Sequence, residues 1–274
     1  TFTHFTDATK KRTNDPKDLN FSEKVNALFF GISNPKPTDT QVPARPYKSM
    51  MLQSNKKIAC WHITIPESKG TIIVFHGYAA QKAAMLTRGE AFLQSGYNVL
   101  LVDFMGSGGS EGNQTTIGFY ESENVKTCYE FIKSQGEKHI YLFGTSMGAV
   151  AILKAIDRFG ISPSGIVLEC PFGNMYKTTK ARFKIMNVPS FPMASLLVFW
   201  GGVENNFWAF GHNPTSYAEH VQCPTLLLYG KHDPKVSSEE IDAIYNNLAG
   251  IKQLKVYPNA GHEDLSEQPE WRND

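Results

Sequence analysis

The stretch "HIYLFGTSMGAVAIL", residues 139–153, decides how this chain folds. Its centre, residues 144–148, has the spacing G-x-S-x-G. The motif alone is a weak signal, because glycine and serine are common and the pattern arises by chance. Its context is stronger, since an apolar run of strand length precedes it and a helical pattern follows over residues 147–160. A sharp strand–turn–helix that exposes a serine hydroxyl is a nucleophile elbow, so Ser146 is the predicted nucleophile.

Apolar runs and helical patterns alternate on both sides of this motif. Continuous apolar runs are typical of strands buried on both faces of a parallel sheet. Six such runs lie at about residues 70–77, 98–104, 139–144, 165–171, 224–230 and 252–258, and two earlier runs, 47–53 and 57–66, are expected to form a hairpin. Helical spacing is clear at residues 125–132 and 241–248, the second behind a capping-box pattern of Ser237 and Glu240. The predicted fold class is α/β, with a mainly parallel central sheet flanked by helices.

Changes in composition divide the chain. Residues 1–46 are polar and interrupted by proline, which predicts an extended N-terminal arm. Residues 47–274 are predicted to form one domain, in which residues 171–223 break the alternation as a cap-like insertion over the carboxyl edge of the sheet. Most aromatic residues of this insertion are expected to pack its own small core, while a few line a substrate pocket. The candidates for the pocket are Tyr78, Phe172, Trp200, Phe207 and Trp208.

The bulk composition excludes several classes of function. The net charge is +1, from 27 basic and 26 acidic residues, and no basic stripe indicates a nucleic acid partner. No apolar run reaches the roughly 20 residues of a membrane-spanning helix, so a soluble domain is expected. The first residue is Thr rather than Met, which predicts a removed start codon, tag, signal or anchor and leaves a cytoplasmic or exported location open. The four scattered cysteines have no C-x-x-C spacing and are expected to be buried free thiols. Oligomeric state is also left open.

A serine nucleophile needs a base, and the base needs a carboxylate that fixes its tautomer. His262 stands in the loop after the last apolar run, where the base of this arrangement belongs. Asp233 follows the preceding run. The chain order Ser146, Asp233, His262 is the Ser…Asp…His order of this kind of fold.

Two other acidic residues end strand-like runs. Glu169 is the main alternative for the acid, but Asp233 is preferred because a short side chain on a turn can reach the histidine loop beside it. Asp103 is expected to brace the glycine-rich loop that follows it.

Hydrogen-bond donors for a tetrahedral intermediate are predicted at two backbone N–H groups. One belongs to Met147, the residue after the nucleophile, and the other to Tyr78, in the loop after residues 70–77. His76 and Gly77 shape that loop, and His76 is expected to be a structural hydrogen-bonding residue rather than a second base.

From about Tyr47 to its end, the chain resembles the α/β-hydrolase superfamily, and within it the serine-aminopeptidase-like and prolyl-oligopeptidase-like esterase branch. The matching pieces are "HGYAAQK" at the oxyanion loop, "DFMGSGGSEG" at the glycine loop, "GTSMGAV" at the elbow, "YGKHDPKV" at the acid and "NAGHED" at the base. Two departures stand out. Met105 replaces the arginine that usually braces the glycine loop, and the chain ends at Asp274, so the helix that normally closes the fold is expected to be short or cut off.

The sequence therefore predicts a serine hydrolase that cleaves a small-molecule carboxylic ester with an apolar acyl or aryl group, through an acyl-enzyme. No cofactor and no metal are expected. A dinucleotide fingerprint fails at Glu111, a zinc-protease motif fails at Ser266, and "YGKHD" lacks the upstream glycine of a phosphate-binding loop. The alternatives are a peptidase, in which Glu204 or Glu219 would hold the substrate amine, an acyltransferase or thioesterase, and, least favoured, a non-catalytic binding module.

Overall fold

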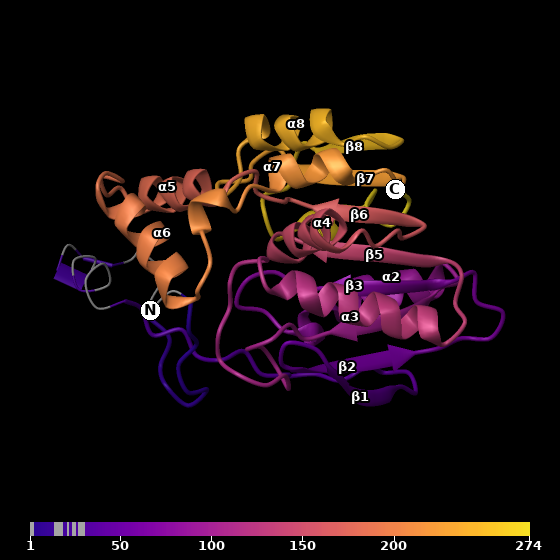
Figure 1. The fold of residues 1–274 in the computed structure, drawn as a ribbon. Coiled ribbons are helices and arrows are strands. Elements are labelled where there is room, and N and C mark those ends of the chain that lie inside the picture. The colour runs from indigo at the N-terminus through magenta and orange to yellow at the C-terminus, as the bar shows by residue number, and fades with distance from the viewer. Residues whose placement is uncertain (1–2, 14–18, 21, 24–25, 27–30) are drawn as a thin grey trace.

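The computed structural model describes the chain except for residues 1–2, 14–18, 21, 24–25 and 27–30. Its centre is an eight-stranded sheet in the order β1-β2-β4-β3-β5-β6-β7-β8 (Figure 1). The strands are β1 (Lys48–Gln53), β2 (Lys57–Ile63), β3 (Thr71–Phe75), β4 (Asn98–Val102), β5 (Ile140–Thr145), β6 (Gly165–Glu169), β7 (Thr225–Gly230) and β8 (Lys252–Tyr257). Strands β3 to β8 run parallel, while β1 and β2 form a hairpin that joins β4 antiparallel. The predicted α/β class and the predicted hairpin are confirmed.

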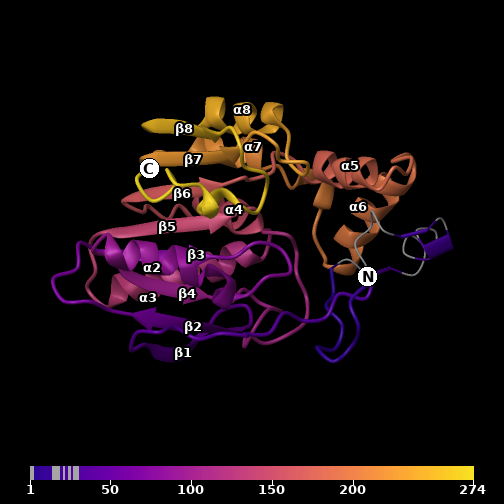
Figure 2. The same ribbon diagram turned by 180° about the vertical axis from the view of Figure 1, so that it is seen from behind.

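Helices cover both faces of this sheet. Helices α3 (Glu121–Ser134) and α4 (Met147–Phe159) lie side by side on one face, and α2 (Leu86–Gln94) lies on the other (Figures 1 and 2). The central strand β3 is therefore buried along its whole length, which explains its unbroken apolar sequence. Helix α8 (Ser238–Asn247) begins with the predicted capping box. Between His262 and Asp274 the only helical element that the structure describes is the short 3-10 turn Leu265–Glu267.

The segment between β6 and β7 holds α5 (Met175–Ile185), α6 (Met193–Glu204) and the single turn α7 (Pro214–Tyr217). Helices α5 and α6 stand beyond one end of the strands rather than on a face of the sheet (Figures 1 and 2). Because α5 is the first helix after the carboxyl end of β6, that end is the carboxyl edge of the sheet. Several of its aromatic side chains pack within the segment, as Tyr176 does against Phe210.

The N-terminal segment is only partly extended, unlike the predicted arm, because residues 8–10 form a turn and residues 22, 23 and 26 are helical. Several of its described residues pack against the domain. Phe5 is buried and its ring lies 6.1 Å from that of Tyr78. The Asn34 amide donates to the Tyr78 hydroxyl at 3.1 Å. The Thr3 hydroxyl donates to Glu204 of α6 at 2.8 Å. The segment thus covers the loop after β3 and one side of the insertion.

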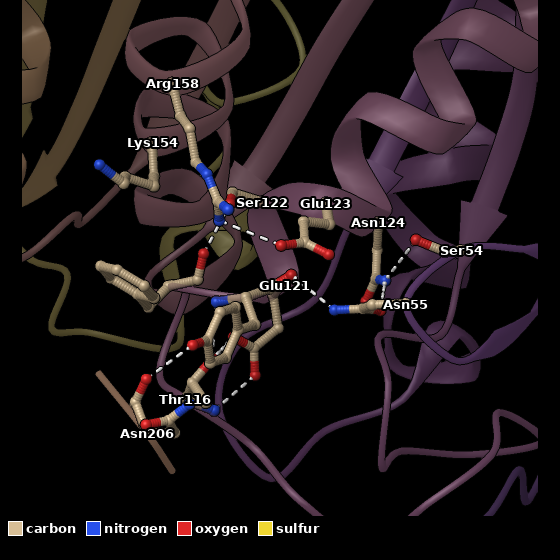
Figure 3. A network of polar contacts seen from close by, with 12 residues as sticks. Ser54, Asn55, Thr116, Glu121, Ser122, Glu123, Asn124, Lys154, Arg158 and Asn206 are labelled. Carbon is tan, nitrogen blue, oxygen red and sulfur yellow. Dashed lines mark hydrogen bonds and ion pairs between the residues drawn. The ribbon is translucent and has the colours of Figure 1, made fainter. Parts of the chain in front are cut away.

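A network of polar contacts holds the glycine loop after β4 (Figure 3). The Met105 N–H donates to the Asn124 side chain at 3.0 Å, and the Asn124 amide donates to Ser54 and Asn55 in the turn of the hairpin. The fully buried Glu121 carboxylate accepts from Thr115 and Thr116 side chains, and from the backbone of Thr116 and Gly118. Position 105 therefore needs no charged side chain, because backbone and amide contacts fix the loop.

A buried lysine supplies the cation that the glycine loop lacks at position 105. Lys82 Nζ lies 2.5 Å from Asp103 Oδ2, and it also contacts the Asp39 carboxylate. Asp103 in turn accepts from the Gly109 N–H at 2.9 Å, which confirms that this aspartate braces the loop. Burial alone would lower the pKa of Lys82, but the two carboxylates more than offset it, so its pKa is raised.

Replacing Lys82 with Met should reduce the free energy of unfolding by about 3 kcal/mol or more, because the buried Asp103 carboxylate loses its counter-charge. Urea unfolding followed by circular dichroism measures this change. Lys57→Met is the matched control, since Lys57 is exposed and its pair with Glu111 is long, at 3.8 Å. Adding Asp103→Asn to Lys82→Met should restore part of the loss. Equal free energies of unfolding for Lys82→Met and Lys57→Met would contradict the stabilising role of the Lys82–Asp103 pair.

His212 anchors the insertion to the loop before α3. The imidazole is fully buried, and its Nε2 lies 3.0 Å from the Ile117 carbonyl, to which only a protonated nitrogen can donate. Its Nδ1 therefore accepts from the Tyr217 hydroxyl at 3.1 Å. Burial lowers the pKa of His212 to about 4, so the native ring is neutral at pH 7.

Stability should therefore fall as the pH drops from about 6.5 to about 4. In this window the unfolded chain binds a proton at His212 that the native state excludes, which costs roughly 3 kcal/mol in total. The measurement is the slope of the unfolding free energy against pH, for the native sequence and for His212→Gln. The native slope should be steeper by up to about 1.4 kcal/mol per pH unit. Parallel slopes would show that His212 is not the titrating group.

Candidate active site

The turn between β5 and α4 places Ser146 in an unusual backbone conformation. Its φ is 52° and its ψ is −110°, a region that non-glycine residues rarely adopt and that costs of order 1–3 kcal/mol. The Ser146 N–H donates to the carbonyl of Glu169 at the end of β6, at 2.7 Å. The turn is thus held by the neighbouring strand, and the side chain stands at the carboxyl edge of the sheet.

The two glycines of the motif permit backbones to approach each other closely. A Cβ atom at Gly148 would lie 2.5 Å from the Phe75 carbonyl oxygen, and one at Gly144 would lie 2.5 Å from the Ala149 nitrogen. Real Cβ atoms do not come this near to backbone atoms. Both positions therefore require glycine so that α4 can start directly beside β3 and β5.

Three side chains predicted from the sequence lie in one hydrogen-bonded line. His262 Nε2 is 3.0 Å from Ser146 Oγ, and His262 Nδ1 is 2.6 Å from Asp233 Oδ2. Since a carboxylate only accepts, Nδ1 carries the proton and Nε2 accepts from the serine hydroxyl. The His262 side chain is 7 % exposed and the Asp233 side chain is fully buried, so the line is shielded from water on the acid side.

The surroundings of Asp233 keep it ionised. Its burial opposes the charge, but the hydrogen bond from His262 and those from the backbone of Lys235 and Val236 lower the pKa of Asp233. The backbone N–H groups of Lys235 and Val236 donate to its other oxygen at 2.7 and 3.0 Å. The carboxylate is thereby fixed in one orientation toward the imidazole.

Glu169, the alternative acid, is engaged elsewhere. Its carboxylate accepts from Arg88 at 2.9 Å, from the Thr145 hydroxyl at 3.0 Å and from the Trp271 indole at 2.7 Å. It thus joins α2, β5 and the C-terminal residues in a structural contact.

The loop after β3 lies next to the serine. A Cβ atom at Gly77 would be 3.7 Å from Ser146 Cβ, which puts the backbone of this loop beside the nucleophile position. Met147 is the first residue of α4, where N–H groups have no intrahelical acceptor. The buried His76 uses both ring nitrogens on backbone groups, Nε2 toward the Phe104 N–H and Nδ1 toward the Gly77 carbonyl. The prediction that His76 is a structural hydrogen-bonding residue is confirmed.

Cys170 is a neighbour of the site that the sequence did not indicate. Its Sγ, a carboxylate oxygen of Asp233 and a ring nitrogen of His262 all lie within 4.8 Å of one another. These three groups could in principle hold a metal ion, but Asp233 and His262 already bind each other. Burial, and then the charge of Asp233, raise the pKa of the Cys170 thiol. As predicted, the four cysteines are free, and all except the partly exposed Cys223 are buried.

The five aromatic candidates for a pocket lie in different places. Tyr78 is packed between Phe5 and Asn34, and Phe172 is buried with its ring 5.8 Å from His212. Trp200 and Trp208 are exposed on the insertion, by 60 % and 66 %. Phe207 stacks on Phe119 at 4.4 Å, and it lines a surface hollow with Trp208 that includes no residue of the serine–histidine–aspartate line. The structure therefore leaves Tyr78 near the serine and sets Trp200 and Trp208 on the outside.

Within the described ranges, no helix is both long and apolar enough to cross a membrane.

Relatives with similar sequences include both unassigned proteins and lipases. The protein YqkD of Bacillus subtilis is 26 % identical over 206 residues, which cover 74 % of this chain and 68 % of that protein. The lysophosphatidylserine lipase ABHD12 of Danio rerio is 25 % identical over 218 residues, 75 % of this chain and 54 % of the lipase. The chain thus spans about half the length of that lipase.

Solved structures with the same fold include esterases. The Pyrococcus furiosus esterase Pf2001 superposes with a TM-score of 0.73 and 25 % identity, covering 87 % of this chain and 93 % of the esterase. An esterase from Exiguobacterium antarcticum has a TM-score of 0.62 and 19 % identity over 82 % of this chain and 97 % of its own. A family model described as serine aminopeptidase, S33, matches residues 66–215 and 202–269. The chain therefore belongs to the serine aminopeptidase S33 family, and it is a hydrolase of the α/β-hydrolase fold.

Proposed function

We propose that this protein is a serine carboxylesterase that cleaves esters with an apolar acyl or aryl group. The observation that carries the proposal is the hydrogen-bonded line from Ser146 through His262 to Asp233, with contacts of 3.0 and 2.6 Å. A serine is a weak nucleophile unless a neighbouring base takes its proton. The esterases of the same fold support ester cleavage as the reaction.

In the proposed reaction, Ser146 Oγ attacks the ester carbonyl carbon and its proton passes to His262 Nε2. Asp233 stabilises the imidazolium that forms. The negative charge that develops on the carbonyl oxygen is stabilised by the N–H groups of Met147 and Tyr78. The carbon–oxygen bond to the alcohol then breaks, and the imidazolium returns the proton to the leaving alkoxide. Water activated by the same histidine hydrolyses the acyl-enzyme.

Ser146→Ala should lower kcat for 4-nitrophenyl butyrate by about 10⁴-fold or more, because both the nucleophile and the covalent step are lost. The same variant should not react with a fluorophosphonate probe, which forms a covalent bond only with an activated serine. Absorbance at the nitrophenolate maximum and in-gel fluorescence are the two measurements.

The matched control is Ser134→Ala, at an exposed serine of α3 that has no contact with the site. This control should keep full activity and full labelling. Labelling of the Ser146→Ala variant, or its retention of ester hydrolysis, would overturn the proposed nucleophile.

Peptide cleavage is the second candidate, since the matching family is named for aminopeptidases. Removal of an N-terminal residue needs a carboxylate that holds the substrate amine. Glu204 is bound by Thr3 and lies 3.5 Å from His4, and Glu219 accepts from Asn247 at 3.1 Å. Both carboxylates that the sequence offered thus have other partners, which favours the ester reaction.

The ratio of rates for matched substrates separates these two candidates. With an alanine 4-nitroanilide beside a 4-nitrophenyl ester of the same acyl group, kcat/KM should favour the ester by at least 10³-fold. An ester with a free α-amine should gain nothing over its deaminated analogue. Comparable rates for the anilide, or a strong preference for the free amine, would assign the site to a peptidase instead.

A further inference from the structure

Helix α5 turns one face toward the interior and the opposite face toward solvent. Met175 and Thr178 are buried and Arg182 is partly buried, and the spacing of these three residues puts them on one side of the helix. Lys177 and Lys184, between and beyond them, are exposed. Thr178 and Arg182 stand one turn apart, so their side chains are neighbours on the inner face.

The Thr178 hydroxyl is buried without a hydrogen-bond partner in the described part of the chain. The residue is 9 % exposed. Its Oγ1 is one of the few buried side-chain oxygen or nitrogen atoms in the described chain that have no hydrogen-bond partner. A threonine inside a helix usually donates to the carbonyl four residues earlier, as the next residue, Thr179, does to Met175 at 2.9 Å. An unsatisfied buried hydroxyl costs about 1–3 kcal/mol, so this orientation points to a missing acceptor.

The Arg182 guanidinium makes no hydrogen bond and no ion pair with any described residue. Burial lowers its pKa, and the nearby charges of Asp233, Tyr78 and Glu263 act in the opposite direction. These groups belong to the loops after β7, β3 and β8, which meet around Ser146. The guanidinium therefore lies within electrostatic range of Asp233, Tyr78 and Glu263. The two carboxylates have other partners, because Asp233 binds His262 and Glu263 contacts Lys235.

A second cation acts on the same side of the site. Burial raises the pKa of Tyr78, while the hydrogen bond from Asn34 and then the charges of Arg12 and Arg182 act in the opposite direction. Arg12 comes from the N-terminal segment and Arg182 from α5. Two segments far apart in the sequence thus bring positive charge to the rim next to the oxyanion loop.

We propose that Arg182 and Thr178 bind an anionic group of the substrate, a carboxylate or a phosphate, at the α5 side of Ser146. This inference rests on the proposed ester hydrolysis and narrows its substrates to esters that carry such a group. A guanidinium binds either anion through two parallel N–H donors, and the threonine O–H supplies a third donor. The bound anion would satisfy the orphan hydroxyl and the unpaired guanidinium together.

The test is binding of intact esters to the Ser146→Ala variant, in which turnover cannot interfere. Isothermal titration calorimetry compares two pairs of equal chain length. In the first, the acyl chain ends in a carboxylate or in its methyl ester; in the second, a butyryl ester of glycerol 3-phosphate stands beside butyrylglycerol. The anionic member of one pair should bind at least 10-fold more tightly than its neutral partner, and the pair in which it does identifies the carboxylate or the phosphate.

Adding Arg182→Gln should weaken binding of that anionic ester by at least 10-fold and change the neutral ester by less than twofold. Arg182→Lys should retain part of the preference, and Thr178→Val should reduce it about threefold. Lys184→Gln and Thr179→Val are the matched controls on the same helix, and both should bind as the parent does. Thermal melts establish that each variant is folded, and Thr178→Val tests the site even where Arg182→Gln unfolds.

No preference for an anion in either pair, or an equal loss for anionic and neutral esters in Arg182→Gln, would overturn this site. Failure of the proposed esterase activity has a different signature. In that case the chain with Ser146 intact hydrolyses no ester and takes no fluorophosphonate label.

Discussion

The approach of three backbones at one point is the constraint on which the rest of the site depends. Strand β5 must turn into α4 beside the end of β3, and a side chain at Gly148 would lie 2.5 Å from the Phe75 carbonyl oxygen. The same crowding forces Ser146 to a φ of 52°. The strain of that conformation is balanced by the bond from its N–H to Glu169 and by the burial of α4. Position, exposure and direction of the serine follow from this one crossing.

Around this crossing, buried charged side chains fall into two groups that differ in their partners. Two sets of buried charges that hold loops are paired, Lys82 with two aspartates and Glu169 with Arg88, whereas Glu121 is held by hydrogen bonds alone. Close to the serine, Asp233 is paired only with a histidine whose proton can move. Arg182 makes no ion pair within the described chain. The fixed pairs hold the loops in place, whereas Asp233 and Arg182 belong to the proposed reaction and the proposed anion site.

The sequence was sufficient for the fold and for the positions of the proposed triad, because each depends on local patterns. Continuous apolar runs predicted the parallel strands, and the order of the strand ends placed Ser146, Asp233 and His262 together. Other features depend on contacts between distant segments, which no local pattern encodes. Lys82 ends the piece "HGYAAQK" after β3, yet only the fold brings it to Asp103. The aromatic candidates show the same limit: Trp200 and Phe172 look alike in the sequence, but one is exposed and the other is buried.

Glu169 has a consequence for how interchangeable the strand ends are. It stands at the end of β6, one strand closer to the serine strand than Asp233, and its backbone carbonyl already contacts Ser146. Its side chain, however, closes a three-way junction of Arg88, Thr145 and Trp271. If Glu169 took the place of Asp233 as the proposed acid, its carboxylate would release all three partners. Arg88 and Trp271, which are buried, would then lose their hydrogen bonds to it. The carboxylate at the end of β6 thus has a structural part. Of these two strand ends, only that of β7 has a carboxylate available for the proposed acid.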